Sequence, residues 1–324
     1  MTKPRVFVTR IIRDAGLNLV REFCDAEIWQ DDLPPTREVL LEKVRGMDGL
    51  LCLLTDHIDG EVLDAAGSQL KVVSNHAVGF DNIVVPDATV RRIPVGNTPG
   101  ILTDATADFA FALLMSASRR VNEAERYLRA GKWKTWGPST LLGMDFVDKT
   151  LGLVGFGRIG RAVAKRAAGF GLRVIYYSPG AQPEFNAAPV ESLDALLHES
   201  DFVSLHTPLN DSTRRMVNAD FLSKMKRNAI LVNTSRGGVV DQDALYQALK
   251  SNQIFAAALD VTDPEPLPMD SPLLTLENCV IAPHIASASE KTRDDMARLA
   301  ASNLIAGLKG ERLPHCVNPE VYGS

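Results

Sequence analysis

Three residues whose types could together carry out hydride chemistry stand a few positions after predicted strands. They are Arg236, Glu265 and His284. Because ligands of open parallel sheets bind beyond the carboxyl ends of the strands, we expect the three side chains to face one cleft. If the substrate is a 2-oxo acid, the guanidinium would hold its carboxylate and polarise the carbonyl. The imidazole would donate a proton to the oxygen as hydride reaches the carbon, and the glutamate would favour the protonated imidazole.

Each of the three also has an ordinary structural explanation when it is considered alone. The arginine could be a surface charge, the glutamate a solvated side chain between prolines, and the histidine a hydrogen-bonded structural residue. Their joint placement near a dinucleotide-binding motif favours catalysis. The remaining histidines lack such partners and are assigned no catalytic role: His57, His76, His198, His206 and His315. His206 and Pro208 follow a predicted strand, however, and are expected to line a cofactor cleft.

A glycine-rich hexapeptide follows the apolar run 151–154 and opens a predicted helix. Its glycines are Gly155, Gly157 and Gly160, and Arg158 and Ile159 lie between them. The first glycine permits a tight turn, the second lets a pyrophosphate approach the backbone, and the third lets the helix pack closely on its strand. The unpaired N–H groups at the helix start would then face the phosphates. We therefore predict that this turn binds a dinucleotide.

Ser178 bears on the choice of nicotinamide cofactor. A sheet that binds NAD usually has an acidic residue at the end of its second strand, where it binds the adenosine ribose. Here that strand ends in Ser178-Pro179-Gly180. A serine does not repel a 2′-phosphate and can donate a hydrogen bond to it. NADP(H) is therefore favoured over NAD(H), although no arginine follows Ser178 closely and Arg158 is only a substitute for one.

Short apolar runs alternate with amphipathic stretches, which is typical of βαβ units in a parallel sheet. The first series of strand-like runs is 5–9, 49–54, 70–74 and 94–97, with helix-like segments at 14–23 and 37–45. The second series is 150–154, 173–177, 202–205, 229–233, 256–260 and 279–282. We predict an α/β protein with two doubly wound parallel sheets, one of them a Rossmann coenzyme domain.

Two further helices connect these series. Residues 103–128 read as one long buried helix, and residues 288–308 read as a second helix after the last strand. The C-terminal helix leaves no room for a third domain, and we expect it to return and complete the first one, partly because of the family resemblance given below. The predicted domains are residues 1–99 with 288–324, which bind substrate, and residues 100–287, which bind the coenzyme.

Composition excludes several classes of function. The 324 residues include 35 Lys and Arg against 40 Asp and Glu, so a net charge of −5 provides no basic surface for nucleic acid or an anionic membrane. The longest apolar runs are too short to span a bilayer, and the N-terminus lacks the apolar region of a signal peptide, which suggests a cytoplasmic protein. The scattered cysteines indicate neither disulfides nor a metal site: Cys24, Cys52, Cys279 and Cys316.

At its motifs the chain resembles the D-isomer-specific 2-hydroxyacid dehydrogenases, and within them it is most similar to glyoxylate/hydroxypyruvate reductases. The similarity covers nearly the whole chain. It comprises five separated segments in family order: 75–81, 155–160, 233–238, 259–266 and 283–287. The resemblance implies a flavodoxin-like substrate domain beside the Rossmann domain, with the reaction in the cleft between them.

The resemblance also implies roles for individual residues. Arg236, Glu265 and His284 match the family's catalytic arginine, glutamate and histidine. The backbone N–H groups of Val78 and Gly79 would bind the substrate carboxylate. Further matching positions are Leu54, which would crowd the substrate side chain, Ser287 near His284, and the cofactor-binding Thr106, Thr234 and Asp260.

The family is typically homodimeric through its coenzyme domains. Residues 129–144 would then form an arm that brings Trp136 towards the partner's active site. Alternatively, Trp133 and Trp136 pack within their own subunit. The chain ends near Tyr322, without the regulatory domain of many phosphoglycerate dehydrogenases, so that activity is less expected.

The expected activity is transfer of hydride from NAD(P)H to a small 2-oxo acid, glyoxylate or hydroxypyruvate, to give the 2-hydroxy acid. The alternatives are another dehydrogenase of this family, acting on phosphoglycerate, D-lactate or formate, and a nucleotide-sensing corepressor that uses the same fold to bind peptides. The presence of the arginine, glutamate and histidine favours turnover over sensing.

Overall fold

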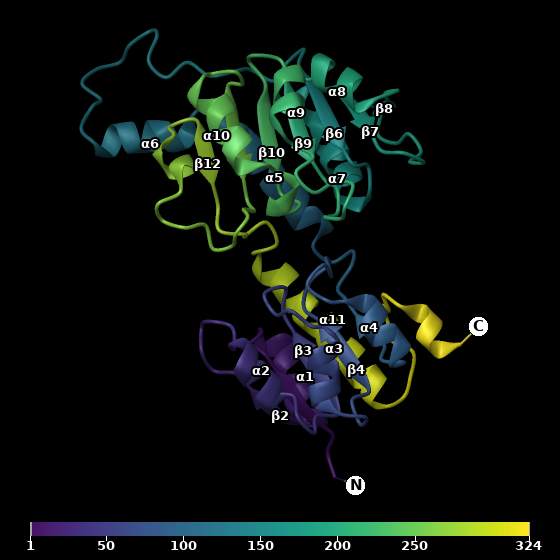
Figure 1. Ribbon diagram of the computed structural model, residues 1–324. Helices are drawn as coiled ribbons and strands as arrows, with labels where there is room; N and C mark the ends of the chain where they lie inside the picture. Colours follow the sequence, from purple (N-terminus) through teal and green to yellow (C-terminus); the bar gives the residue numbers. More distant parts are fainter. Residues whose placement is uncertain (1, 324) are drawn as a thin grey trace. The chain divides into compact units, whose positions relative to one another are not determined.

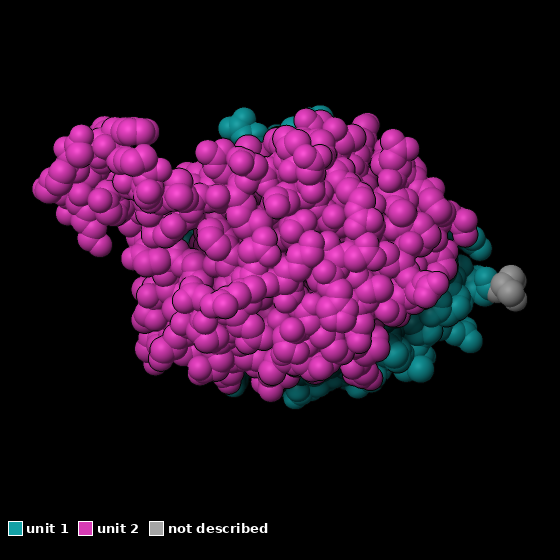
Figure 2. All heavy atoms as spheres, turned by 90° about the horizontal axis from the view of Figure 1, so that it is seen from above, with its two compact units in different colours: residues 1–102, 288–324 teal, residues 103–287 magenta. Residues whose placement is uncertain are grey.

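The computed structural model describes residues 2–323, which form two compact units. Unit 1 contains the chain up to Leu102 and again from Ala288 onward, and unit 2 contains Thr103–Ser287 (Figure 2). The chain first passes from unit 1 to unit 2 after Leu102, three residues later than the expected boundary after residue 99. Unit 2 starts there because Thr103 is the first residue of a helix.

Unit 1 is built on a five-stranded parallel sheet with the strand order β2-β1-β3-β4-β5; Figure 1 labels its strands β2, β3 and β4. The strands are β1 (Arg5–Val8), β2 (Asp25–Ile28), β3 (Gly49–Cys52), β4 (Val72–Asn75) and β5 (Val95–Gly96). This order is that of a flavodoxin-like doubly wound sheet. β2 was not predicted, because it is an edge strand with alternating exposed and half-buried residues rather than an apolar run.

Helices cover both faces of this sheet. They are α1 (Asp14–Phe23), α2 (Arg37–Lys43), α3 (Gly60–Ala66), α4 (Val85–Val90) and α11 (Glu290–Leu308), followed by the short 3-10 helix η4 (Pro319–Tyr322). α11, from the end of the chain, packs against α1 so closely that a side chain at Gly16 would lie 2.2 Å from the carbonyl oxygen of Ala297. Residues 288–323 therefore complete the core of unit 1.

Unit 2 contains a seven-stranded parallel sheet with the order β12-β11-β10-β9-β6-β7-β8. Its strands are β6 (Thr150–Val154), β7 (Arg173–Tyr177), β8 (Ala188–Pro189), β9 (Phe202–Leu205), β10 (Ile230–Asn233), β11 (Ala256–Leu259) and β12 (Cys279–Ile281). The order is that of a Rossmann sheet with a further strand at the β12 edge, so the predicted fold class is confirmed. Only β8 was missed, because two exposed residues with a proline give no strand signal.

The helices of unit 2 are α5 (Thr103–Ser118), α6 (Val121–Arg129), α7 (Arg158–Ala167), α8 (Leu193–Glu199), α9 (Ala219–Lys224) and α10 (Gln242–Lys250). Short 3-10 helices are η1 (Ala168–Phe170), η2 (Gly237–Val239) and η3 (Pro272–Thr275). Across residues 2–323, no helix has both the length and the apolar character that a membrane span needs.

The prediction of one helix over residues 103–128 is wrong. The chain breaks at Arg120, which has the left-handed φ of 54° that ends a right-handed helix. The guanidinium of Arg120 pairs with Glu123 at 2.7 Å and stabilises the new direction. The two helices also differ in environment, since α5 is largely buried against the sheet and α6 has no buried residue. The hydrophobic pattern of the sequence continues past the break between α5 and α6 and therefore does not reveal it.

Candidate active site

The glycine turn lies between β6 and α7 and has very little room for side chains. Gly155 has a φ of 96°, and an added Cβ there would lie 2.6 Å from the carbonyl oxygen of His206. An added Cβ on Gly160 would lie 2.4 Å from the carbonyl oxygen of Gly155. At Gly157, by contrast, a Cβ would meet nothing within 4 Å. The first and third glycines are thus required by the chain itself, and the second leaves open space beside the helix start.

The start of α7 presents free backbone donors to that space. Gly157 is its N-cap and has no side chain with which to satisfy them. Arg158, the first helical residue, is exposed and Ile159 is half-buried. Unpaired N–H groups and the positive end of the helix dipole favour an anion at this position.

A half-buried histidine lies directly behind the turn. His206 Nε2 is 2.9 Å from Ser204 Oγ, and the His206 amide donates to the carbonyl oxygen of Val154 at 2.8 Å. Burial lowers the pKa of His206 to about 4, so its ring is neutral at pH 7. His206 therefore supports the turn without adding charge, and the adjacent Pro208 is exposed.

Two buried hydroxyl groups near the carboxyl ends of β9 and β10 have no hydrogen-bond partner among the described residues. They are Thr207 Oγ1 and Thr234 Oγ1. Buried polar groups are normally paired, so an unpaired hydroxyl beside an open turn fits a ligand that supplies the missing partner. With the glycine cradle, these hydroxyls suit a dinucleotide. Thr106, also expected at the cofactor, is buried on α5.

Ser178 is half-buried at the end of β7, and its carbonyl oxygen accepts a hydrogen bond from the Ala181 amide at 3.1 Å. The loop that follows is attached to α7 by an ion pair between Glu184 and Arg161. This pair brings a carboxylate and a guanidinium to the loop that follows Ser178, and no sequence motif indicates either of them.

Glu265 and His284 are joined by a hydrogen bond at the ends of neighbouring strands. His284 Nδ1 lies 2.8 Å from Glu265 Oε2, and the Thr262 amide donates to Glu265 Oε1 at 3.0 Å. Burial alone would raise the pKa of Glu265, but the His284 hydrogen bond and charge, the Thr262 amide and the charge of Arg236 together lower it below its ordinary value. Glu265 is therefore ionised at neutral pH and favours a positive charge on the imidazole.

Arg236 follows β10 in a tightly bonded turn. Its carbonyl oxygen accepts from Asn233 Nδ2 at 2.9 Å, and its Nη1 donates to the carbonyl oxygen of Ser235 at 2.9 Å. Its charge is close enough to lower the pKa of Glu265. The structure thus brings all three predicted side chains together at the carboxyl edge of one sheet.

Asp260 shapes the loop that carries His284. It is 1% exposed, and its two carboxylate oxygens accept from the amides of Ile285 at 2.7 Å and Ala286 at 2.9 Å. Its own carbonyl oxygen accepts from the His284 amide at 2.8 Å, while His284 has an unusual φ of 54°. Asp260 thereby fixes a strained backbone, a role that sequence reasoning missed although it had selected the residue. Ser287, two residues further on than Ile285, is buried.

The remaining predicted substrate residues lie in unit 1 or on an exposed segment of unit 2. Leu54 follows β3 and is 37% exposed. Val78 and Gly79 follow β4, and both are half-buried. Trp136 lies between α6 and β6 and is 78% exposed, so packing of this side chain within its own subunit is contradicted.

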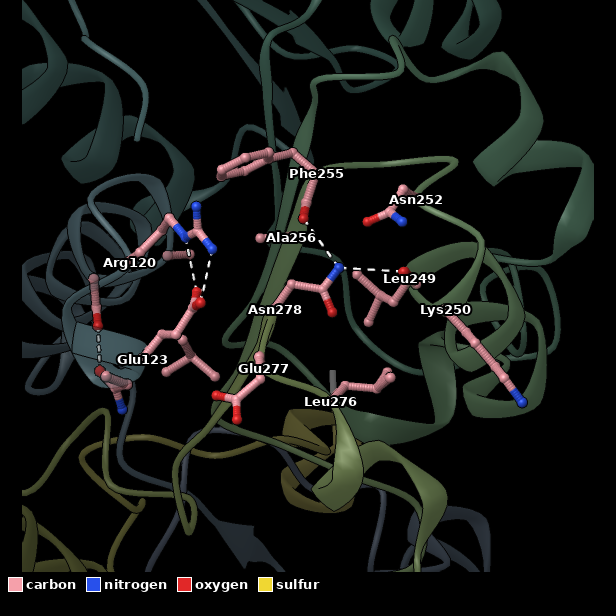
Figure 3. Close-up of a pocket in the computed structure, with 14 residues that line it drawn as sticks. Arg120, Glu123, Leu249, Lys250, Asn252, Phe255, Ala256, Leu276, Glu277 and Asn278 are labelled. Carbon is pink, nitrogen blue, oxygen red and sulfur yellow. Dashed lines mark hydrogen bonds and ion pairs between the residues drawn. The ribbon is translucent and has the colours of Figure 1, made fainter. Parts of the chain in front are cut away.

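A cavity of about 400 Å³ in unit 2 has none of the predicted site residues in its lining (Figure 3). It is at the amino ends of β11 and β12, beside the corner between α5 and α6. The Arg120–Glu123 ion pair lines one side, and Asn278 on the other donates to the carbonyl oxygens of Leu249 and Phe255. Because these polar groups satisfy one another, the cavity shows no sign of the chemistry found at the opposite edge.

Known proteins match both the second unit alone and nearly the whole chain. The model of the D-isomer specific 2-hydroxyacid dehydrogenase NAD binding domain matches residues 111–286. The glyoxylate reductase of Korarchaeum cryptofilum is 55% identical over 323 residues, covering 98% of this chain and 97% of that protein.

Solved structures match over nearly the full length. A protein from Thermus thermophilus is 48% identical, with a TM-score of 0.92, and the match covers 97% of this chain and 99% of that one. An NADPH-dependent glyoxylate/hydroxypyruvate reductase from Sinorhizobium meliloti, solved with NADP and malonate, is 31% identical, with a TM-score of 0.85 and 98% of each chain covered.

Proposed function

Because the chain belongs to the D-isomer specific 2-hydroxyacid dehydrogenase family, we propose that it reduces small 2-oxo acids, glyoxylate and hydroxypyruvate first, to 2-hydroxy acids. The observation that carries this proposal is the Glu265–His284 pair, 2.8 Å apart, with the charge of Arg236 beside it. All three lie at the same sheet edge as the glycine turn, where Rossmann sheets bind their ligands.

The nicotinamide cofactor, when bound, supplies a hydride, which is two electrons and one hydrogen. The amides at Gly157 and the start of α7 would hold its phosphates, and the unpaired hydroxyls of Thr207 and Thr234 would gain partners. As hydride adds to C2 of the substrate, negative charge develops on the carbonyl oxygen. His284 donates its proton to that oxygen, and in the oxidation direction the same nitrogen takes the proton back.

Arg236 and Glu265 prepare this step. The planar guanidinium of Arg236 holds the substrate carboxylate and polarises the carbonyl, and it stays charged at any working pH. Glu265 orients the His284 ring through their hydrogen bond and places a negative charge beside it. In unit 1, the N–H groups of Val78 and Gly79 bind the substrate carboxylate and Leu54 limits the side chain, while Ser287 lies near His284.

The cofactor is NADP(H) in preference to NAD(H). Ser178 in place of an acidic residue supports this preference, since it adds no charge where a 2′-phosphate would lie. The Sinorhizobium meliloti relative is named as NADPH-dependent and was solved with NADP. The negative charge of Glu184, in the loop after Ser178, would disfavour a 2′-phosphate. Glu184 forms an ion pair with Arg161, however, and this pair neutralises its charge.

The working form is a homodimer. Residues 130–149 contain no helix or strand, and Figure 1 shows them as a long loop between α6 and β6. Their large apolar side chains are mostly exposed: Trp133, Trp136, Leu142 and Val147. Apolar groups gathered on one exposed segment favour a partner surface, and a second copy that receives Trp136 near its active site satisfies this.

A rate comparison tests substrate class and cofactor together. Purified protein is assayed with NADH and NADPH against glyoxylate, hydroxypyruvate, pyruvate and 3-phosphohydroxypyruvate. We expect the highest kcat/KM with NADPH and the first two acids. A peak with pyruvate or the phosphorylated acid would reassign the substrate within the family. Folded protein without turnover on any pair would overturn the reductase, and peptide capture under those conditions would support the nucleotide sensor.

A further inference from the structure

The turn after β4 has an unusual set of hydrogen bonds to its backbone carbonyls. The carbonyl oxygen of Ala77 accepts from the Thr98 amide at 2.9 Å, that of Val78 from Asn97 Nδ2 at 2.8 Å, and that of Gly79 from Asn75 Nδ2 at 2.9 Å. Three successive carbonyls are therefore held by donors at the carboxyl ends of β4 and β5.

The directions of these three carbonyls also fix the directions of the N–H groups that follow them. In a trans peptide the carbonyl of one residue and the N–H of the next point in opposite directions. Among the described residues the cis bonds lie elsewhere, before Pro264 and Pro266. Holding three carbonyls towards the strand ends therefore turns the amides of Val78, Gly79 and Phe80 away from them. Within residues 2–323 these amides donate no hydrogen bond, and the turn runs from half-buried at Val78 and Gly79 to exposed at Phe80.

The two asparagines are themselves fixed by their surroundings. Asn75 is fully buried, and its Nδ2 also lies 3.1 Å from Asn82 Oδ1. Asn82 in turn donates to the carbonyl oxygens of Leu53 and Asp56, both at 3.0 Å. One network therefore joins the loop after β3 to the turn after β4.

Asn97 is held in place by a residue of the C-terminal helix. It is 8% exposed, and its carbonyl oxygen accepts from Asn303 Nδ2 of α11 at 2.9 Å. Asn303 is fully buried and also accepts from the His315 amide at 3.1 Å. The C-terminal helix therefore helps to set the position of Asn97.

We propose that Asn75 and Asn97 are positioning residues that build a carboxylate-binding turn, in which Asn97 directs the Gly79 amide and Asn75 directs the Phe80 amide towards the substrate. This inference rests on the proposed function, which assigns the substrate carboxylate to Val78 and Gly79, and it adds Phe80 as a third donor. An asparagine is required because an aspartate of the same shape cannot donate to a carbonyl and would place a negative charge beside the anion.

The first test compares asparagine variants of one unit. Asn97→Leu and Asn97→Asp, and the same changes at Asn75, should raise the KM for glyoxylate about tenfold, while the Kd for NADPH changes less than twofold. Asn318→Leu is the matched control, since Asn318 is also fully buried in unit 1 and donates to the Ile93 carbonyl at 3.0 Å. It should lower Tm without changing KM. Folded Asn75 and Asn97 variants with the KM of the unchanged protein would overturn the proposal.

A second test does not depend on turnover or on the folding of a variant. The amide resonances of ¹⁵N-labelled protein are followed while oxamate, an unreactive 2-oxo carboxylate analogue, is added. We expect the amides of Val78, Gly79 and Phe80 to shift in a saturable manner. Saturable binding elsewhere with these three unmoved would overturn the turn as a carboxylate site. An absence of reductase activity combined with these shifts would instead overturn the proposed function alone.

Discussion

Glu265 determines what His284 can do, because the two side chains share a hydrogen bond of 2.8 Å. The carboxylate is ionised at neutral pH, since the neighbouring positive charges and the Thr262 amide lower its pKa despite burial. An ionised partner stabilises the imidazolium and also orients the ring. Asp260 then fixes the backbone on which the ring is carried.

Replacing Glu265 by Gln should lower kcat for glyoxylate reduction at least about tenfold at pH 7.5, because the imidazolium loses its counter-charge while the shape of the site is retained. The loss should be larger at pH 9 than at pH 6, because the negative charge of an ionised carboxylate favours proton binding nearby most where protons are scarce. Steady-state rates across this pH range check the prediction. A uniform loss at all pH values would instead indicate that Glu265 only shapes the loop.

His76 gives a residue-scale prediction about stability. Burial lowers the pKa of this 7% exposed side chain from 6.5 to about 4, with a smaller effect of Arg293. Between these values the unfolded chain binds a proton that the folded chain does not, so stability falls as pH falls from 6.5 to 4. His76→Gln should reduce the difference in unfolding free energy between pH 7 and pH 5 by roughly 1 to 2 kcal/mol. Urea denaturation at both pH values measures it. An unchanged difference would contradict the buried, neutral state of His76.

At the scale of elements, each functional group lies just after the carboxyl end of a strand. The order of the strands in the sheet, rather than closeness in sequence, brings these groups together. Arg236, Glu265 and His284 follow β10, β11 and β12, which are adjacent in the sheet. The glycine turn follows β6, two strands from β10. Parallel strands all release their chain at the same edge, so one topology brings the cofactor turn and the catalytic side chains together.

Ser178, at the end of β7, should decide the choice of cofactor. Ser178→Asp adds a charge that repels a 2′-phosphate and binds the ribose hydroxyls of NADH. We expect kcat/KM for NADPH to fall at least about tenfold and that for NADH to rise. Ser178→Ala is the control, since it removes the hydroxyl without adding charge and should have a much smaller effect. A ratio of the two cofactors that does not move in Ser178→Asp would contradict the assignment.

Buried parallel strands were the most predictable elements, because an apolar run bounded by polar residues has few alternatives. Strands β6, β7 and β9 and helix α1 begin and end where expected. The edge strand β2 and the corner at Arg120 were missed, since one is polar and the other depends on a single left-handed residue.

The same contrast holds within the site. Arg236, Glu265 and His284 could be selected because each is a chemically active side chain just beyond a strand. Asn75 and Asn97 could not, because each donates to a backbone carbonyl, and such contacts leave no pattern of residue types. The role of Asp260 also depends on amides that lie 25 and 26 positions further along the chain.

At the scale of the whole molecule, the chain crosses between its two units twice, and α11 completes the unit in which the chain began. The exposed segment 130–149 belongs to unit 2, and its Trp136 is 78% exposed in the structure of residues 2–323. The proposed dimer gives this segment both a partner surface and a function.

Sedimentation should therefore show a dimer, of about twice the 35.2 kDa of one chain. Trp136→Ala should raise the KM for glyoxylate, because the side chain is proposed to reach the partner's active site. Met269→Ala is the matched control, since Met269 is an apolar residue of unit 2 that is 89% exposed, and it should leave KM unchanged. A fully active monomer at assay concentration would contradict the arm.

The central claim is that His284 protonates the substrate oxygen during hydride transfer. It is tested most directly by single-turnover oxidation of bound NADPH on mixing with glyoxylate, in the unchanged protein and in His284→Ala, with the Kd for NADPH measured in parallel. The account predicts that hydride transfer slows about 100- to 10,000-fold while the Kd stays within twofold. Hydride transfer at the original rate in the folded variant, or an equal loss of cofactor binding, would contradict it.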